Sequence, residues 1–189
     1  AWVSNFGENA LYKLAEPGRL EGRINFLYRE RHMSPFEHGS FTFFVDTPIF
    51  VAREFMRHRT ASYNETSGRY KELEPRFFVV PEDRPLVQKG KVGAYRFVPG
   101  PEQRGAVQRI TRWANKISWA AYQGMLRMGV AREVARNVLP LNTMTQFYVT
   151  MNPRNVMQFL QLRNDPNALE EIRLVAQAIE DEFARAMPL

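Results

Sequence analysis

The chain has 189 residues, 44% of them hydrophobic and 13% aromatic, which excludes a disordered chain and suits one globular domain with a substantial core. Its formal net charge of +6 suits an anionic ligand, and nucleic acid is the rival partner for a basic protein. The positive excess comes from arginines dispersed along the chain, without a lysine-rich tail or a recognised nucleic-acid fold motif, so we expect no nucleic-acid partner.

Helical and strand patterns alternate in the first half of the chain. Phe41, Phe43 and Val45 alternate with their neighbours, as in a sheet that is buried mostly on one side. Thr47 can cap the helix that follows, and Pro48 can occupy its first turn, because the N–H that proline lacks is unpaired there anyway. The predicted elements are a helix opened by Pro17-Gly18, a strand over 40–45, a helix over 49–56, a short strand over 76–80 and an irregular loop over 81–101.

A long helix is predicted from about Glu102 to Met128. At about 1.5 Å rise per residue it would extend ~40 Å, which is long for a domain of this size. Such a helix is more easily buried in an oligomer than along a single small domain. Its apolar stripe consists of Ala106, Ile110, Trp113, Ile117, Ala121 and Met128.

The last third of the chain adds a strand and three helices. Arg132 and Arg136 are four residues apart and share a helical face opposite valines. The predicted elements are a helix ending at Pro140, a strand over 143–151, a helix from Asn152-Pro153 to about 163, and a last helix from Asp165-Pro166 whose buried stripe is Leu169, Ile172, Val175, Ile179 and Phe183. Together these elements predict an α+β fold, with mixed helices, a short antiparallel sheet and a long central helix, in a single domain over residues 1–189.

Two absences narrow the chemistry. The chain has no cysteine, which excludes disulfides, thiolate metal sites and a cysteine nucleophile. No apolar run reaches the length of a membrane span, and the start lacks a basic stretch followed by an apolar core. We therefore expect a cytoplasmic protein with no membrane partner.

The segment 57–70 is the most informative part of the sequence. It holds three arginines, a histidine, a glutamate, an asparagine and two serines, and it contains no lysine. Guanidinium groups match phosphate oxygens, and hydroxyls and backbone N–H groups near a glycine can bind the remaining oxygens. A solvated polar loop is the alternative, but such loops favour lysine and glutamate. The segment therefore predicts a site for a phosphorylated ligand.

The order of these residues resembles the motif of the flavin-dependent thymidylate synthases. That motif reads Arg-His-Arg, two residues, Ser, one residue, Asn-Glu, one residue, Ser, one residue, Arg-Tyr, and every fixed position is met here. The resemblance extends to three flanking segments, over 32–38, 132–140 and 158–163. The family usually carries an additional N-terminal strand, and the chain starts without Met, so we expect that this strand is missing from the sequence.

The resemblance implies that several segments hold a flavin, FAD. Asn152 is also a predicted helix cap, and Gln158 departs mildly from the family, where Asn or His is common. The expected FAD-binding residues are His32, Ser34, Arg57, His58, Arg59, Glu65, Asn152 and Gln158.

The same resemblance implies a dUMP site. Ser67 and Gly68 would supply a hydroxyl and a close backbone to the phosphate, and Arg69 would neutralise its charge. Ion pairing is the alternative role for Glu54, and a solvated helix face is the alternative for Arg136. The expected dUMP-binding residues are Glu54, Phe55, Met56, Arg57, Glu65, Thr66, Ser67, Gly68, Arg69, Arg136 and Arg163.

Arg163 is the expected catalytic residue. By resemblance it lies near the uracil, where a permanent cation can stabilise negative charge on the pyrimidine. Its alternative roles are a salt bridge to Asp165 or a contact with the last carbonyls of its helix. His58 lies between two arginines that disfavour its protonated form, so we expect a binding role and no acid–base role. His32, Glu37 and His38 lack metal-ligand spacing, so we expect no metal.

The resemblance implies the reductive methylation of dUMP to dTMP. 5,10-Methylenetetrahydrofolate would supply the carbon, reduced FAD the hydride, and NADPH would re-reduce the flavin. The protein would be a homotetramer with sites shared between subunits, since one helix and the next loop both supply residues for one nucleotide. The alternatives are a flavin- or nucleotide-binding protein without synthase activity, and a basic nucleic-acid-binding module.

Overall fold

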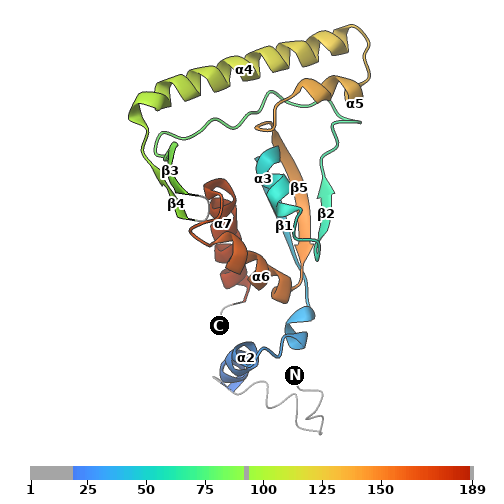
Figure 1. Cartoon of the computed structure of the whole chain (residues 1–189). Helices are drawn as coiled ribbons and strands as arrows, with labels where there is room; N and C mark the ends of the chain where they lie inside the picture. Colours follow the sequence, from blue (N-terminus) through green and yellow to red (C-terminus); the bar gives the residue numbers. More distant parts are fainter. Residues whose placement is uncertain (1–18, 92–93, 188–189) are drawn as a thin grey trace. The chain divides into compact units, whose positions relative to one another are not determined.

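The computed structural model describes residues 19–91 and 94–187 (Figure 1). The chain divides into two compact units. Among the described residues, unit 1 takes in 19–45, 54–64 and 148–187, and unit 2 takes in 46–53 and 65–147. The α+β class is confirmed by the mixture of helices and two small sheets. The prediction of a single domain over 1–189 stays a prediction.

The larger sheet has three strands in the order β1-β5-β2, formed by β1 (Phe41–Pro48), β5 (Met144–Met151) and β2 (Ser62–Glu65). Strands β1 and β5 confirm the predicted strands over 40–45 and 143–151. Thr42 and Thr150 share a hydrogen bond of 2.9 Å between their hydroxyls. The short strand β2 was not predicted, and it lies inside segment 57–70, which carries the motif.

Helix α3 (Ile49–Phe55) confirms the predicted helix, but its start differs from the prediction. Thr47 and Pro48 end strand β1 and do not cap the helix. The first N–H groups of α3 are satisfied by the chain that leads into β5, because the N–H of Ile49 donates to the Thr143 carbonyl and that of Phe50 to the Leu141 carbonyl. A tertiary contact therefore replaces the local cap.

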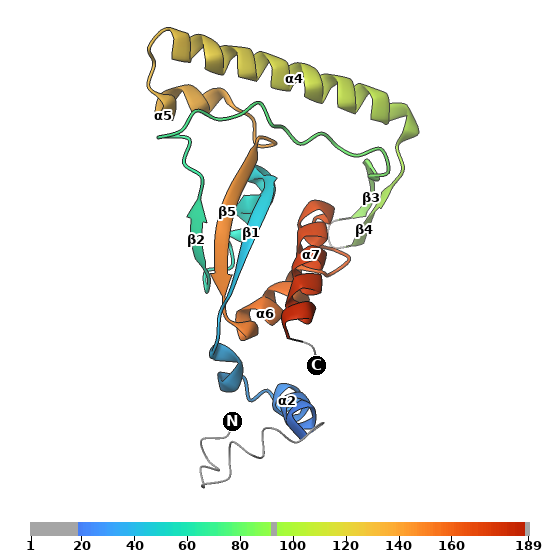
Figure 2. The same cartoon turned by 180° about the vertical axis from the view of Figure 1, so that it is seen from behind.

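Unit 1 contains α2 (Arg19–Arg29), the short 3-10 helix η2 (Ser34–Glu37), α6 (Pro153–Arg163) and α7 (Glu170–Ala186). Helices α6 and α7 pack side by side (Figure 2). The predicted helices opened by Pro17-Gly18 and by Asn152-Pro153 are confirmed, although 17 and 18 lie outside the described residues. Helix α7 starts later than predicted, because Asp165 Oδ1 accepts a hydrogen bond from the N–H of Asn167 and forms a turn.

The core of unit 1 is aromatic and aliphatic. The rings of Phe55 and Phe159 stack with centroids 4.3 Å apart, and both side chains are fully buried. The predicted stripe of α7 is confirmed at Ile172 and Ile179, which are buried together with Ala176. This core joins the end of α3 to α6 and α7.

Unit 2 contains a β-hairpin that contradicts the predicted loop over 81–101. Strands β3 (Val87–Lys91) and β4 (Ala94–Val98) pair antiparallel, with Val87 opposite Val98. Their side chains are mostly exposed on both faces, so the sequence lacks the alternation that marks a half-buried strand. The predicted strand over 76–80 is also wrong, since this segment pairs only through the single bridge between Phe77 and Thr143.

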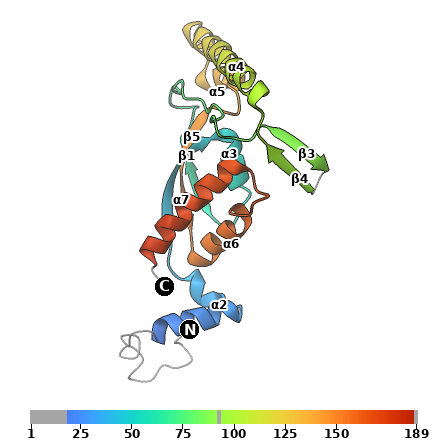
Figure 3. The ribbon, with the colours of Figure 1, turned by 90° about the vertical axis from the view of Figure 1, so that its left-hand side faces the viewer.

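Helix α4 (Pro101–Arg127) confirms the predicted long helix and leads from the hairpin to α5 (Arg132–Ala135) and the 3-10 turn η3 (Arg136–Val138) (Figure 1). Figure 3 looks nearly along α4 and shows the hairpin pointing away from it. The buried residues of α4 are Asn115 and Tyr122. Its predicted apolar stripe faces solvent in the single chain, where Ile110 is 63% and Trp113 65% exposed.

Candidate functional site

Four of the predicted site residues, all in unit 1, lie together at the C-terminal ends of helices α3 and α6. We call Glu54, Arg57, His58 and Arg163 the Arg163 cluster. The Nε–H of Arg163 donates to His58 Nε2 at 2.9 Å, Nη1 donates to Glu54 Oε2 at 2.9 Å, and Nη2 donates to the Glu54 carbonyl at 3.0 Å. Arg57 Nη1 lies 3.5 Å from Glu54 Oε1. Arg163 therefore forms a salt bridge with Glu54, and not with Asp165, the alternative partner considered from the sequence.

The turn that carries His58 is held by a tyrosine. The Tyr63 hydroxyl donates to the carbonyls of Phe55 and His58, each at 2.9 Å, and the N–H of His58 also donates to the Phe55 carbonyl. Burial raises the pKa of Tyr63 to about 12, so its hydroxyl keeps its proton. Tyr63 thus fixes the chain between the end of α3 and strand β2.

One face of α6 supports the Arg-His-Arg segment. Asn155 Nδ2 donates to the Thr60 carbonyl at 2.7 Å, the Phe159 ring contacts the His58 ring at 4.9 Å, and Arg163 binds His58. These residues are four apart, which places them on one helical face. Asn155, Phe159 and Tyr63 were not predicted as site residues, although the four-residue spacing was a signal for the first two. Asn152 caps α6 as predicted, by accepting from the N–H of Asn155.

His58 is held in the neutral form. Burial lowers its pKa below the usual value of 6.5, the nearby Arg163 guanidinium lowers it further, and the Glu54 carboxylate opposes both. The predicted lowering of the His58 pKa is confirmed. Its causes are burial and Arg163, and not the neighbouring Arg57 and Arg59. Because Nε2 accepts from Arg163, the ring proton lies on Nδ1.

The other predicted residues of unit 1 are mostly exposed. Arg57 has a side chain that is 73% exposed, and Arg59 is exposed and has no ion-pair partner among residues 19–91 and 94–187. Phe55 is 0% exposed, and its carbonyl accepts hydrogen bonds from Tyr63 and His58, so it offers no surface to a ligand in the single chain. His32, Ser34 and Gln158 are exposed and lie outside the Arg163 cluster, and Met56 is half-buried.

A second group of predicted residues meets in unit 2. We call Ser67, Gly68, Arg69, Glu133 and Arg136 the Arg69 cluster. The Nε–H of Arg69 donates to Glu133 Oε2 at 2.9 Å, and both side chains are about half exposed. The Ser67 hydroxyl oxygen accepts from the N–H of Arg69 at 3.3 Å, which leaves the hydroxyl proton free to donate. Glu133 is a member that the sequence analysis did not identify.

Gly68 is buried in the Arg69 cluster, and an added side chain would crowd its neighbours. A Cβ at this position would lie 3.1 Å from Leu73 Cδ1 and 3.4 Å from Arg136 Cδ. Helix α5 holds the same turn, because Arg132 Nη1 donates to the Tyr70 carbonyl at 3.2 Å. The predicted face of Arg132 and Arg136 therefore lies against the end of the motif. Glu65, which precedes the cluster, accepts from the Thr145 hydroxyl.

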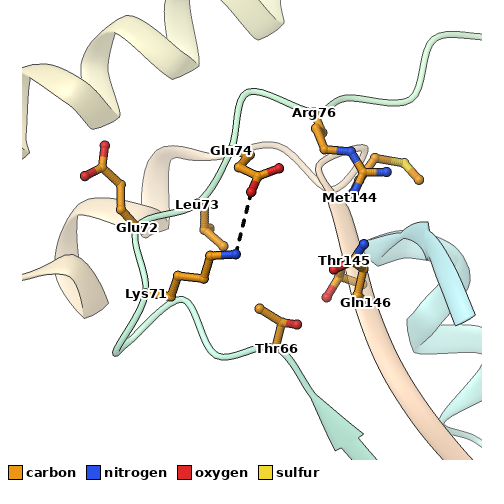
Figure 4. A pocket seen from close by; sticks show the side chains of 9 residues that line it. All are labelled: Thr66, Lys71, Glu72, Leu73, Glu74, Arg76, Met144, Thr145 and Gln146. Atoms are coloured by element: carbon orange, nitrogen blue, oxygen red, sulfur yellow. Dashed lines mark ion pairs between the residues drawn. The ribbon is translucent and has the colours of Figure 1, made fainter. Parts of the chain in front are cut away.

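A small hollow in unit 2 lies between the segment 71–76 and the start of β5 (Figure 4). Thr66, Thr145 and Gln146 line it, and Lys71 Nζ lies 3.6 Å from Glu74 Oε1. Its volume of about 50 Å³ holds a few water molecules and is too small for a nucleotide. A hollow of about 810 Å³ in unit 1, beside α6 and α7, has none of the predicted site residues in its lining.

Neither a metal site nor a membrane span is present in the part of the chain that the structure describes. No group of three or more His, Asp or Glu side chains that could hold a metal ion occurs over residues 19–91 and 94–187. None of the helices in these ranges combines the length and the apolar composition needed to cross a bilayer.

Comparison with known proteins identifies the family. The profile of the family "Thymidylate synthase complementing protein" matches residues 3–189. The chain therefore belongs to this family, and the resemblance found in the sequence is confirmed. The flavin-dependent thymidylate synthases of Streptomyces avermitilis and Streptomyces coelicolor are each 49% identical to it over 199 residues, which cover all of this chain and 81% of each relative.

Solved structures agree with the family. The UMP/dUMP methylase PolB from Streptomyces cacaoi, bound with 5-Br dUMP, is 43% identical, with a TM-score of 0.90 over 98% of this chain and 83% of that one. The same protein bound with 5-Br UMP gives 41% identity and a TM-score of 0.87 over 94% of this chain and 83% of that one.

Proposed function

We propose that this chain is a flavin-dependent thymidylate synthase that converts dUMP to dTMP in the cytoplasm, with 5,10-methylenetetrahydrofolate as carbon donor and NADPH as the source of reducing equivalents. The observation that carries the proposal is the Arg163 cluster, in which a largely buried guanidinium is held at the end of the Arg-His-Arg segment. Family membership supports the same assignment.

The Arg69 cluster binds the phosphate of dUMP in this proposal. The Arg69–Glu133 pair is half exposed, and such pairs contribute only about 0–1 kcal/mol, so a phosphate can replace the carboxylate. Ser67 supplies a hydroxyl donor, and Arg136 lies against Gly68 and adds a second cation. Thr66, Glu65 and Met56 are the neighbouring contacts proposed for the nucleotide.

Arg163 acts on the uracil. Its guanidinium stays cationic at every relevant pH and can stabilise negative charge on the pyrimidine oxygens as that charge develops. The side chain is only 18% exposed, so this interaction takes place with little solvent screening. The chain has no cysteine to add to the pyrimidine, so activation by polarisation is the route open to it.

The residues expected to hold FAD suit an anionic cofactor. Arg57 and Arg59 present exposed guanidinium groups, which match a diphosphate, and neutral His58 has an Nδ1–H donor. His32, Ser34, Glu65, Asn152 and Gln158 are the further residues proposed for it. When bound and reduced, the flavin supplies the hydride for the methyl group.

The proposed assembly is a homotetramer with shared sites. The exposed stripe of α4, with Ile110, Trp113, Ile117 and Met128 at least half exposed, is a large apolar surface for one chain. Burial of this stripe against other copies would remove it from water, and closed symmetric assemblies are the usual outcome for such a surface.

Turnover tests the function. Purified protein should be yellow, and it should form dTMP from dUMP only when methylenetetrahydrofolate, NADPH and FAD are all present. A colourless protein that binds nucleic acid, or a flavoprotein without turnover, would contradict the proposal. UMP belongs in the same assay as a second candidate substrate, because PolB is a methylase of both nucleotides.

A further inference from the structure

The hydrogen bonds that Arg163 makes with the described residues use three of its N–H donors. A guanidinium has five N–H donors in a rigid plane. The contacts to His58 Nε2, Glu54 Oε2 and the Glu54 carbonyl use one donor on each of its three nitrogens. The two donors that remain lie one on each terminal nitrogen. The side chain is therefore oriented through all three nitrogens, and each terminal nitrogen keeps one further donor for a ligand.

Glu54 is poorly suited to direct contact with a nucleotide. Its carboxylate would repel a phosphate, and both oxygens already have cationic partners, Oε1 with Arg57 at 3.5 Å and Oε2 with Arg163 at 2.9 Å. We propose that Glu54 and neutral His58 are positioning residues that hold the guanidinium of Arg163 in its reactive orientation. This inference rests on the proposed function, and it replaces direct dUMP binding by the Glu54 side chain.

The two positioning residues bind different nitrogens of Arg163. The Glu54 carboxylate and carbonyl accept from both terminal nitrogens, which holds the outer end of the guanidinium. His58 accepts from Nε, so the third nitrogen is held as well. A protonated His58 would present an N–H to the N–H of Arg163 and could not accept. Orientation by His58 therefore requires the neutral ring.

The charges of the cluster leave it cationic. Glu54 carries one negative charge, while Arg57 and Arg163 carry one positive charge each, so the cluster keeps an excess positive charge when His58 is neutral. The groups that face His58 are Glu54 and Arg163, with Tyr63 bound to its carbonyl. Glu54 can thus position Arg163 without cancelling the charge that acts on the uracil.

Steady-state kinetics of the protein loaded with FAD test the role of Glu54. In Glu54→Gln the shape is kept and the charge is lost, so we expect kcat to fall at least about tenfold while KM for dUMP changes less than about threefold. Glu182→Gln, which removes another carboxylate paired with an arginine, is the matched control and should leave both parameters unchanged. A raised KM with unchanged kcat would mean that Glu54 binds the nucleotide directly, and unchanged values of both would equally overturn the proposal.

Nitrogen NMR of the His58 ring gives a second readout that needs no turnover. The wild-type ring should be the Nδ1–H tautomer at neutral pH, and its pKa should fall further in Glu54→Gln, because the carboxylate raises it. An Nε2–H tautomer or an imidazolium at pH 7 in the wild type would overturn the proposal even if the variant failed to fold. A wild-type protein that forms no dTMP would refute the proposed function, whereas the ring signals would still decide how Arg163 is held.

Discussion

Truncation of Arg69 tests whether the Arg69 cluster recognises the nucleotide phosphate. A bidentate contact from a guanidinium to a phosphate contributes about 1.5–3 kcal/mol. In the free protein Arg69 is paired with Glu133 across 2.9 Å, and a half-exposed pair of this kind contributes up to about 1 kcal/mol. Binding of dUMP must break this pair, so the net loss in Arg69→Ala should be about 1.5 kcal/mol, or roughly tenfold in Kd.

Glu133, the ion-pair partner of Arg69, should have the opposite effect on dUMP binding when its charge is removed. Glu133→Gln removes the competing carboxylate, so it should tighten dUMP binding by up to about fivefold, which corresponds to the ~1 kcal/mol of the broken pair. Isothermal titration calorimetry with dUMP measures both variants, with Arg185→Ala as the control for an exposed arginine in an ion pair. Deoxyuridine lacks the phosphate and should bind both variants like the wild type. An equal loss for dUMP and deoxyuridine, or weaker dUMP binding by Glu133→Gln, would refute the assignment.

The remaining predictions concern the cofactor, the assembly and acid stability. Arg59→Ala removes an exposed cation and should yield folded but largely colourless protein; stoichiometric FAD, measured by absorbance, would contradict its role. Trp113→Glu places a charge in the exposed stripe of α4, so light scattering should report fewer than the four chains expected for the wild type. The lowered pKa of His58 means that the unfolded chain binds more protons than the folded one between that pKa and 6.5. The free energy of unfolding should therefore fall as pH falls from 6.5 through that window, and His58→Gln should lack this dependence in denaturant titrations.

The family could be predicted from the sequence because its motif is carried by contiguous residues. Segment 57–70 shows its family by the identity and order of fourteen neighbours, which folding does not change. Helices α4 and α6 were predicted for a similar reason, since helical periodicity and a cap such as Asn152 are local properties. The β3–β4 hairpin was missed because its exposed strands carry no such pattern.

The partner of Arg163 was decided only by the tertiary structure. The sequence offered Asp165, two residues away, but Asp165 forms a turn with Asn167, and Arg163 extends from the last turn of α6 to Glu54, which is 109 residues distant. The burial of Phe55 against Phe159 brings the end of α3 to α6 and makes that contact available. The exposure of Trp113 could likewise not be predicted from the sequence. Periodicity defines the apolar face of a helix, but only packing determines what covers that face. The sequence thus determined the family and the candidate residues, and tertiary packing determined which of these residues meet.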